Sequence, residues 1–221
     1  MTHQSTMQTP RTTKKEVLTQ FRTREILAAT RQLLEQRGSE AVTMEDIAAR
    51  AGLAKGTLYL YFRSKEDLLQ ALLSQVGEQM ESELTAILAA ASAPPAKLDQ
   101  ALAMLMQYLE RERVLFPLYL RTIFAGGRRG EGRDNQVLAV ERRVLALFAR
   151  LFAEGMARGD FIAADPALLT FLLRGLVRAV GLYQMAGGGR DAVRQALPVV
   201  SAIVFSGFLR ADRSGAGEVK P

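Results

Sequence analysis

Apolar residues recur three and four positions apart along most of the chain, which is the spacing of an amphipathic α-helix. Beyond residue 65 there is no run of alternating β-branched residues of the kind that marks strands. Glycine, proline and polar residues separate the apolar segments from one another. The pattern therefore predicts an all-α fold of about nine helices.

Short breaks separate the predicted helices. These helices cover about residues 21–36, two short segments within 43–62, and residues 65–91, 96–111, 114–124, 136–158, 167–185 and 190–209. Residues 125–135 are rich in glycine and charge, and they are predicted to form a mobile loop. Pro198 falls inside the last helix and is expected to kink or split it, because proline cannot donate the backbone hydrogen bond.

Residues 43–62 carry the strongest local signal in the chain. Thr43 is expected to cap the first short helix with its hydroxyl, and Asp46 three positions later completes a capping box. Gly52 stands at the turn, where the chain needs a positive φ that glycine adopts without steric conflict. Ala48 is small enough for two helices to cross closely. This arrangement is that of a helix-turn-helix, whose second helix enters the major groove of DNA.

The flanking residues extend the motif. An amphipathic helix that would end at Gly38 precedes it, and Ser64 with Asp67 forms a second capping box that opens a long helix. The whole run closely resembles the N-terminal domain of the tetracycline-repressor (TetR) family of transcriptional regulators. The segments that carry the resemblance are Thr23-Arg24-Glu25-Ile26-Leu27, Lys55-Gly56-Thr57-Leu58-Tyr59 and Arg63-Ser64-Lys65-Glu66-Asp67-Leu68-Leu69.

The resemblance implies a division of the chain into four parts. These are a flexible basic arm at residues 1–20, a DNA-binding domain at residues 21–81 with its motif at about 44–63, a helical ligand-binding and dimerisation domain at residues 82–210, and a disordered tail at residues 211–221. Over the larger half, the resemblance rests on length and helix pattern alone.

The resemblance also implies roles for residues around the second short helix. The residues expected to hold DNA phosphates are Thr43, Tyr59, Tyr61 and Lys65, and those expected to meet base edges are Lys55, Gly56 and Thr57. Many relatives have Ser at the position of Ala54 and His at that of Tyr61. Ala54 therefore leaves the helix without a side-chain cap, while Tyr61 keeps a phosphate donor. Leu60 is apolar and is suited to touch a thymine methyl group.

The net charge of +6 is concentrated near the N-terminus. Residues 1–65 hold 11 Lys/Arg and 6 Asp/Glu, a net charge of +5, whereas residues 66–221 hold 18 and 17, a net charge of +1. This distribution is typical of a protein that binds phosphates through one domain. The cations expected to attract phosphates from the arm and first helix are Arg11, Lys14, Lys15, Arg22 and Arg24. A solvated arm that improves solubility is the alternative interpretation.

The middle helices carry methionine and aromatic side chains at helical spacing, which suit an apolar ligand pocket as well as an ordinary core. The residues predicted to line a pocket are Met104, Tyr108, Phe116, Tyr119, Leu120, Phe124, Phe148, Phe152, Phe171, Arg174 and Arg178. The family resemblance favours the pocket, since its members usually sense a ligand in this half. For the two arginines three roles stay open: pairing with an anionic ligand, pairing with carboxylates of a neighbouring helix, or facing solvent.

The last two predicted helices are the most apolar, and each carries small residues that permit the close approach of another helix. Two such helices from each of two chains would form a four-helix interface with two-fold symmetry, as in the resembled family. The residues predicted at this interface are Gly175, Ala179, Leu182, Ala202, Phe205 and Leu209. A core hairpin within a monomer is the alternative. A dimer is favoured because it presents two recognition helices to successive major grooves.

Composition argues against several other classes of protein. The chain has no cysteine and its lone His3 lies in a polar N-terminal segment, so neither a metal site nor a cofactor is predicted. No phosphate-cradling loop precedes a helix, and no enzymatic activity is expected. Residues 1–20 lack the apolar core of a signal peptide. Because Arg174 and Arg178 interrupt the apolar segment 167–185, we expect a cytoplasmic protein that does not enter a membrane.

These expectations describe a homodimer that binds double-stranded DNA at a palindromic operator. The function they favour is a transcriptional repressor that releases its operator on binding an apolar or amphipathic small molecule. A transcriptional activator, or a DNA-binding protein without an effector, shares every DNA-binding feature and stays as the alternative. A small-molecule binding module with a vestigial helix-turn-helix is a third interpretation, which salt-dependent binding to duplex DNA would exclude.

Overall fold

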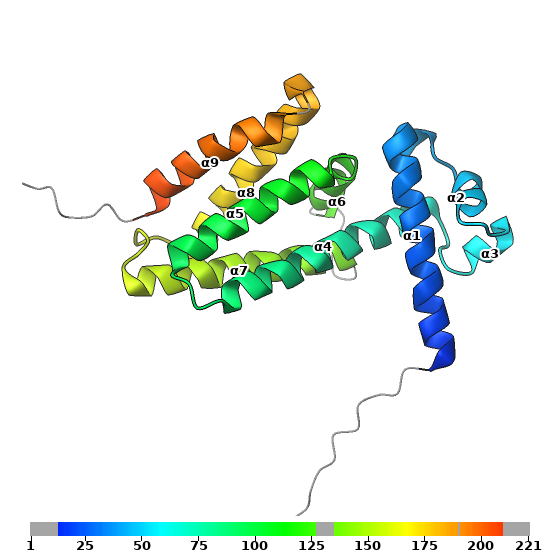
Figure 1. The fold of residues 1–221 in the computed structure, drawn as a ribbon, viewed down its shortest axis with the longest axis horizontal. Helices are drawn as coiled ribbons and strands as arrows, with labels where there is room; N and C mark the ends of the chain where they lie inside the picture. The colour runs from blue at the N-terminus through cyan, green and yellow to red at the C-terminus, as the bar shows by residue number, and fades with distance from the viewer. Residues whose placement is uncertain (1–12, 127–134, 190, 210–221) are drawn as a thin grey trace, which may run out of the picture. The chain divides into compact units, whose positions relative to one another are not determined.

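A computed structural model describes residues 13–126, 135–189 and 191–209. Within these residues nine α-helices follow one another, and one isolated β-bridge joins Phe161 to Leu209 (Figure 1). The prediction of an all-α fold is thereby confirmed. The chain divides into two compact units, Met1–Leu72 and Leu73–Pro221, and the division falls inside helix α4 (Lys65–Ala89). Most of the predicted loop and the predicted tail lie outside the described residues.

Helix α1 (Lys14–Ala41) begins earlier than the predicted start at residue 21. The Glu16 N–H donates to the Thr13 hydroxyl (3.3 Å), and the Thr13 N–H donates to the Glu16 carboxylate (2.7 Å). This capping box starts the helix at Lys14, so the prediction of a flexible arm is wrong for residues 14–20. Residues 1–12 of that arm lie outside the described part of the chain. Near the other end, Gly38 leaves the helical conformation with a φ of 74°.

Helices α2 (Met44–Arg50) and α3 (Lys55–Tyr59) are the predicted pair of short helices. The Asp46 N–H donates to the Thr43 hydroxyl (3.1 Å) and the Thr43 N–H donates to the Asp46 carboxylate (3.0 Å), which forms the predicted capping box. Gly52 holds the turn at a φ of 66°. Helix α2 packs against both α1 and α3. The buried residues of the two short helices are Met44, Ile47, Ala48 and Leu58.

Five further helices follow α4 in the second unit. The helices of this unit that follow α4 are α5 (Pro94–Arg111), α6 (Phe116–Gly126), α7 (Gln136–Arg158), α8 (Pro166–Tyr183) and α9 (Ala192–Phe208), with a π-helical segment at Gln184–Gly188. Helix α8 packs against α5, α7 and α9, and α5 also packs against α7 and α9 (Figure 1). On the outer faces of α8 and α9, apolar side chains such as Leu172 and Ile203 stay exposed to solvent.

Pro198 does not split the last helix, contrary to one of the expected effects. Helix α9 continues through it as a single element. Val193, Val200 and Val204 are buried on both sides of the proline, so packing holds the two segments in line. Tertiary contact here outweighs the loss of one backbone hydrogen bond.

An aromatic cluster closes the core of the second unit. Phe152 is fully buried, and its ring centroid lies 5.6 Å from that of Phe161 and 5.7 Å from that of Phe208. We expect Phe152→Ala to lower the free energy of unfolding by about 3–5 kcal/mol, since it removes a large apolar side chain and leaves a cavity. Urea denaturation measures this change, with Phe152→Leu as the milder control. A loss below about 1 kcal/mol would contradict the assignment of Phe152 to the core.

Candidate functional site

Helix α3 is anchored by one side chain and presents the others outward. Leu58 is fully buried, whereas Tyr59 and Leu60 are 42% and 83% exposed. Lys55 and Gly56 at the start of the helix are also exposed. Ala54 precedes α3 without a side-chain cap hydrogen bond, as the sequence indicated. Of the predicted DNA-contacting residues of this helix, Lys55, Gly56 and Tyr59 are therefore exposed to solvent, and Thr57 is partly exposed.

The lysine at the start of α3 is paired with a carboxylate of α2. Lys55 forms an ion pair with Glu45, and both side chains are more than half exposed. The hydrogen bond to Glu45 raises the pKa of Lys55, and the same bond lowers the pKa of Glu45. Lys55 is therefore cationic at neutral pH, and its ion pair with Glu45 is exposed to solvent and weak enough to be exchanged for another acceptor.

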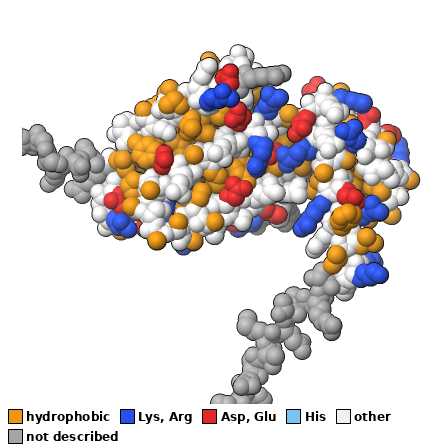
Figure 2. Space-filling model, in the orientation of Figure 1, with side chains coloured by type: hydrophobic (Ala, Val, Ile, Leu, Met, Phe, Trp, Pro, Cys, Tyr) orange, Lys and Arg blue, Asp and Glu red, His pale blue; other side chains and the backbone are white. Residues whose placement is uncertain are grey.

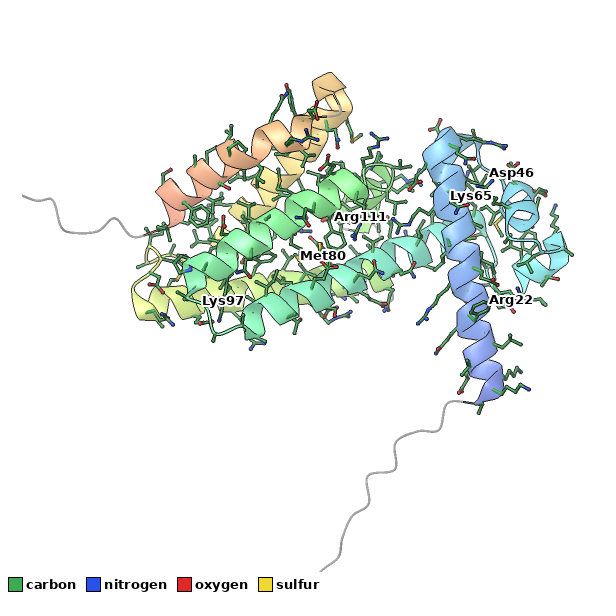
Figure 3. The ribbon with its side chains drawn as sticks, viewed as in Figure 1. Arg22, Asp46, Lys65, Met80, Lys97 and Arg111 are labelled. Atoms are coloured by element: carbon green, nitrogen blue, oxygen red, sulfur yellow. The ribbon has the colours of Figure 1, made fainter. Side chains whose placement is uncertain are left out.

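Thr43 precedes the helix-turn-helix in the sequence, and Lys65 follows it. The Thr43 hydroxyl donates to the Asp46 carboxylate (2.6 Å), and this hydrogen bond lowers the pKa of Asp46. The Thr43 hydroxyl hydrogen is thus already donated to Asp46 in the capping box. Lys65, at the first position of α4, and Tyr61 are partly exposed. Figure 3 labels Asp46 and Lys65 within the first unit.

Further cations lie along the first turns of α1. Lys14, Lys15, Arg22 and Arg24 are all exposed, and Arg22 pairs with Glu25 at 2.8 Å. Figure 2 shows Lys and Arg side chains distributed over the visible face of the first unit. Arg11, the remaining predicted cation of the arm, lies outside the described residues.

The second unit contains a cavity of about 110 Å³ between α4, α5, α6, α7 and α8. Five residues that the sequence predicted for a pocket line it, namely Tyr108, Phe116, Tyr119, Arg174 and Arg178. Most of the other lining residues are apolar: Leu73, Val76, Gly77, Met80, Leu105, Leu109, Leu115, Val137, Val140 and Val177. Met80 contributes from α4 (Figure 3). The remaining lining residues are the carboxylates Glu112 and Glu141.

Six residues predicted for the pocket lie elsewhere. Phe148 and Phe152 are fully buried in the core, and Met104 and Leu120 are buried without lining the cavity. Phe124 and Phe171 are 66% and 63% exposed. These residues were predicted from their apolar type and helical spacing. That pattern does not tell whether a side chain lies in the core, in the cavity wall or on the outer surface.

A polar cluster forms part of the cavity wall. The Arg174 Nη2 donates to both Glu141 carboxylate oxygens (2.9 and 2.7 Å) and to the Tyr119 hydroxyl (2.8 Å). The Arg178 Nη2 donates to Glu141 Oε1 (2.9 Å) and to the same hydroxyl (3.1 Å). The Tyr119 hydroxyl donates to Glu141 Oε1 (3.0 Å). Of the three roles left open for the arginines, the structure therefore contains pairing with a carboxylate of a neighbouring helix.

The cluster is held in one protonation state at neutral pH. Burial acts to raise the pKa of Glu141, but the charges of Arg174 and Arg178 outweigh it and hold the pKa below its ordinary value of 4.5. Burial lowers the pKa of Arg174, but Tyr119 and Glu141 raise it above its ordinary value. Burial raises the pKa of the Tyr119 phenol, which stays protonated and able to donate.

The lowered pKa of Glu141 predicts a loss of stability in acid. The carboxyl titrates near 4.5 when unfolded and lower when folded, so its stabilisation is fully present above pH 4.5 and is lost as pH falls through the folded pKa. We expect Glu141→Gln to show a smaller decrease in unfolding free energy than the wild type between about pH 6 and about pH 3. Chemical denaturation across this range measures it. Glu110→Gln, at an exposed position of α5, is the control, and a Glu141→Gln profile parallel to the wild type would contradict the assignment.

A second polar group adjoins the cavity on α5. The Tyr108 hydroxyl donates to Glu83 (2.7 Å), and the guanidinium of Arg111 lies 4.3 Å from the centroid of the Tyr108 ring. Burial, followed by the bond to Glu83, raises the pKa of Tyr108 to about 12. The Arg111 Nε also pairs with the lining residue Glu112 at 3.0 Å. The charge of Glu112 is therefore matched locally.

Sequence reasoning missed Glu141 as a site residue. It lies on α7 in register with the buried residues Val137, Val140, Val144 and Phe148. A carboxylate on the apolar face of an amphipathic helix is a signal that could have identified it. Gly181 was likewise not singled out for the pocket, although a Cβ there would lie 2.4 Å from the Phe116 ring. The absence of a side chain at Gly181 lets α8 approach Phe116 of α6 closely.

The outer surfaces of α8 and α9 are apolar in the single chain. The predicted interface residues Gly175, Ala179, Leu182 and Ala202 are exposed, and Phe205 and Leu209 are partly exposed. Larger exposed side chains accompany them, including Leu168, Leu172, Val199 and Ile203. Figure 2 shows hydrophobic side chains gathered on the visible face of the second unit.

Two further observations concern metal binding and membranes. The described residues contain no group of three or more His, Cys, Asp or Glu side chains that could hold a metal ion. Pro166–Gly188 is long and apolar enough to cross a membrane by length and composition. An 18-residue stretch of it has a mean hydropathy of 1.3, and 39% of that stretch is buried inside the structure. Its Arg174 is bonded to Glu141 of α7, which favours a helix packed within the protein.

Comparison with known proteins relates this chain to transcriptional regulators. Residues 26–72 match the family model described as bacterial regulatory proteins, tetR family. The chain is 31% identical over 140 residues to the HTH-type transcriptional repressor KstR of Mycobacterium tuberculosis, a match that covers 63% of this chain and 62% of that repressor. It is 30% identical over 140 residues to KstR of Mycolicibacterium smegmatis, covering 63% and 67%. The crystal structure of FadR from Bacillus subtilis in complex with stearoyl-CoA has a similar fold, with a TM-score of 0.67, 20% identity, and coverage of 83% and 97%.

Proposed function

Because the chain belongs to the tetR family of bacterial regulatory proteins, we propose that it is a sequence-specific DNA-binding transcriptional repressor released from its operator by a small-molecule effector. One observation carries this proposal. Within the segment that matches the family model, α3 is anchored by Leu58 and leaves Lys55, Gly56 and Tyr59 exposed. A short helix held in this way is suited to the major groove.

The DNA contacts divide into base-reading and phosphate-binding groups. In this proposal Lys55 exchanges Glu45 for a guanine, and Thr57 meets base edges beside Gly56, which allows close approach of the backbone. Leu60 touches a thymine methyl, and Ala54 precedes the helix at the DNA surface without capping it. Phosphates are held by Tyr59, Tyr61 and Lys65, and by Thr43 if its hydroxyl exchanges Asp46 for a phosphate. The cations of α1 add attraction that depends on salt concentration.

A palindromic operator requires two copies of the reading helix. We propose a homodimer formed by the outer faces of α8 and α9, through Gly175, Ala179, Leu182, Ala202, Phe205 and Leu209. The exposed apolar side chains of these helices support this, because a monomer leaves them in water. Two-fold symmetry of the protein then matches two-fold symmetry of the operator.

The cavity of the second unit is the proposed effector site. FadR was crystallised with stearoyl-CoA, and a largely apolar cavity in this chain supports a small apolar or amphipathic effector. Helix α4 begins in the first unit and contributes Leu73, Val76 and Met80 to the cavity wall in the second. A ligand that binds better to the conformer with mis-spaced reading helices lowers operator affinity by its differential affinity. A coupling of about 2–3 kcal/mol gives a tens-fold loss.

The alternative function is a transcriptional activator or an effector-independent DNA-binding protein of the same fold. The cavity with its buried polar cluster favours a ligand-responsive protein over an effector-independent one. As a DNA-binding regulator the protein would act in the cytoplasm and would need no catalytic activity.

Fluorescence anisotropy on duplex DNA from upstream of its own gene tests the proposed function. Titrations at several salt concentrations are combined with a panel of lipophilic and acidic compounds. We expect sequence-specific binding, a steep loss of affinity with salt, and release by at least one compound. Binding with no preference for this DNA over a scrambled duplex would reject the repressor, and specific binding that no compound weakens would favour the alternative.

A further inference from the structure

Two arginines share one carboxylate in the cavity wall. Arg174 is 7% exposed, Arg178 is 22% exposed and Glu141 is 9% exposed, and both arginines pair with Glu141 within 2.9 Å. The other lining carboxylate, Glu112, is already paired with Arg111. The cluster around Glu141 therefore carries a net charge of +1 inside a largely apolar cavity.

This charge cannot be removed by loss of a proton. Arginine stays protonated in proteins, and its charge has a larger effect in a medium of low dielectric constant than in water. Both guanidinium groups use the same nitrogen, Nη2, for the contacts with Glu141 and Tyr119. The buried Nε atoms of Arg174 and Arg178 have no hydrogen-bond partner among the described residues. One unmatched positive charge, on two guanidinium groups that share a single carboxylate, thus lies in the cavity wall.

We propose that the effector of this protein is an apolar monocarboxylic acid whose carboxylate binds Arg178 and Arg174. The proposal rests on the proposed effector site and specifies the chemistry of its ligand. The carboxylate of the ligand would be the second one in the cluster, beside that of Glu141. Two negative charges would then match two guanidinium groups, which bind carboxylates in a planar arrangement. The hydrocarbon part would lie against Val76, Met80, Leu105 and Val177.

The size of the cavity limits the hydrocarbon part. One water molecule occupies about 10–15 Å³ of cavity volume measured in this way. A cavity of about 110 Å³ therefore has room for roughly ten non-hydrogen atoms, if each is counted as one water molecule. Octanoic acid and cyclohexanecarboxylic acid are of this size, one linear and one cyclic. They serve as the probes of the class.

Isothermal titration calorimetry on the full chain without DNA tests the proposal directly. The probes are octanoate with octan-1-ol and octylamine, and cyclohexanecarboxylate with cyclohexylmethanol, in a buffer that contains no carboxylate. We expect at least one acid to bind about 10–100-fold more tightly than its alcohol, which is the usual effect of a hydrogen bond to a charged group. Octylamine is expected to bind more weakly than octanol.

Variants at Arg178 locate the effect. Arg178→Gln is expected to reduce the preference for acid over alcohol to less than about threefold while leaving alcohol binding nearly unchanged. Arg178→Lys keeps the charge without the planar fork, and it should retain part of the preference. Arg194→Gln is the matched control, because Arg194 is exposed on α9 and is absent from the cavity wall. It should behave like the wild type.

The possible failures are distinguishable. Equal binding of acids and alcohols, or tighter binding of octylamine, would overturn the acid assignment while leaving the cavity as an effector site. Binding of none of the probes would overturn the assignment and would also count against the cavity as the effector site. Because no DNA is present, neither result depends on the proposed operator binding.

Discussion

The double variant Lys55→Ala/Tyr59→Ala should bind operator DNA at least about 1000-fold more weakly than the wild type at the same salt concentration, because a homodimer loses both contacts in each of its two half-sites. A lysine contact with guanine contributes about 1–3 kcal/mol, and a phosphate hydrogen bond from a tyrosine about 1 kcal/mol. Both side chains are exposed, so their removal leaves the core around Leu58 intact. Fluorescence anisotropy on operator and scrambled duplexes measures the loss, and Lys55→Ala alone should reduce the discrimination between them.

Arg142→Ala is the control for this experiment. It removes one exposed cation from α7 in the second unit, and it should change operator affinity by less than about threefold. Light scattering should show an unchanged oligomeric state for all variants. If the double variant bound the operator as tightly as the wild type, α3 would not be the reading helix.

The second large effect is expected at the outer face of α8. Ala179→Glu places a carboxylate among the exposed apolar residues that we assign to the dimer interface. Two-fold symmetry brings two copies of the charge into that interface, and an unpaired buried charge costs about 3–5 kcal/mol. We expect the dimer dissociation constant to rise by about 100-fold or more, and operator affinity to fall by at least about tenfold. Analytical ultracentrifugation measures the first, and anisotropy the second.

Ala86→Glu provides the matched control, because it adds the same charge at an exposed position of α4. It should leave both constants close to those of the wild type. An Ala179→Glu variant that still sedimented as a dimer and bound DNA normally would place the interface elsewhere.

Helix limits were predictable where local capping determines them. Helix α7 spans Gln136–Arg158 as predicted, since Asn135 caps its start and Gly159 ends it with a φ of 79°. The early start of α1 was missed, although the capping box of Thr13 and Glu16 is visible in the sequence. Continuity of α9 through Pro198 was not predictable from local pattern, because it depends on packing of residues on both sides.

The cavity was predictable in composition but not in detail. Tyr108, Phe116 and Tyr119 were identified by type and spacing, whereas Phe148 has the same spacing pattern and lies in the core. The pairing of Glu141 with Arg174 joins residues far apart in the chain. No local pattern specifies such a pair. By contrast, the helix-turn-helix is a local structure, and caps, turn glycine and buried positions within residues 43–62 determine it.

Dimethyl sulfate protection of operator DNA tests the central claim most directly, because this reagent methylates guanine N7 in the major groove and adenine N3 in the minor groove. If α3 of each of two protomers lies in the major groove, guanine N7 should be protected in two symmetry-related clusters. These clusters should be centred about one helical turn, or a multiple of it, apart. They should disappear with Lys55→Ala/Tyr59→Ala. A single cluster, or protection confined to adenine N3, would contradict the account.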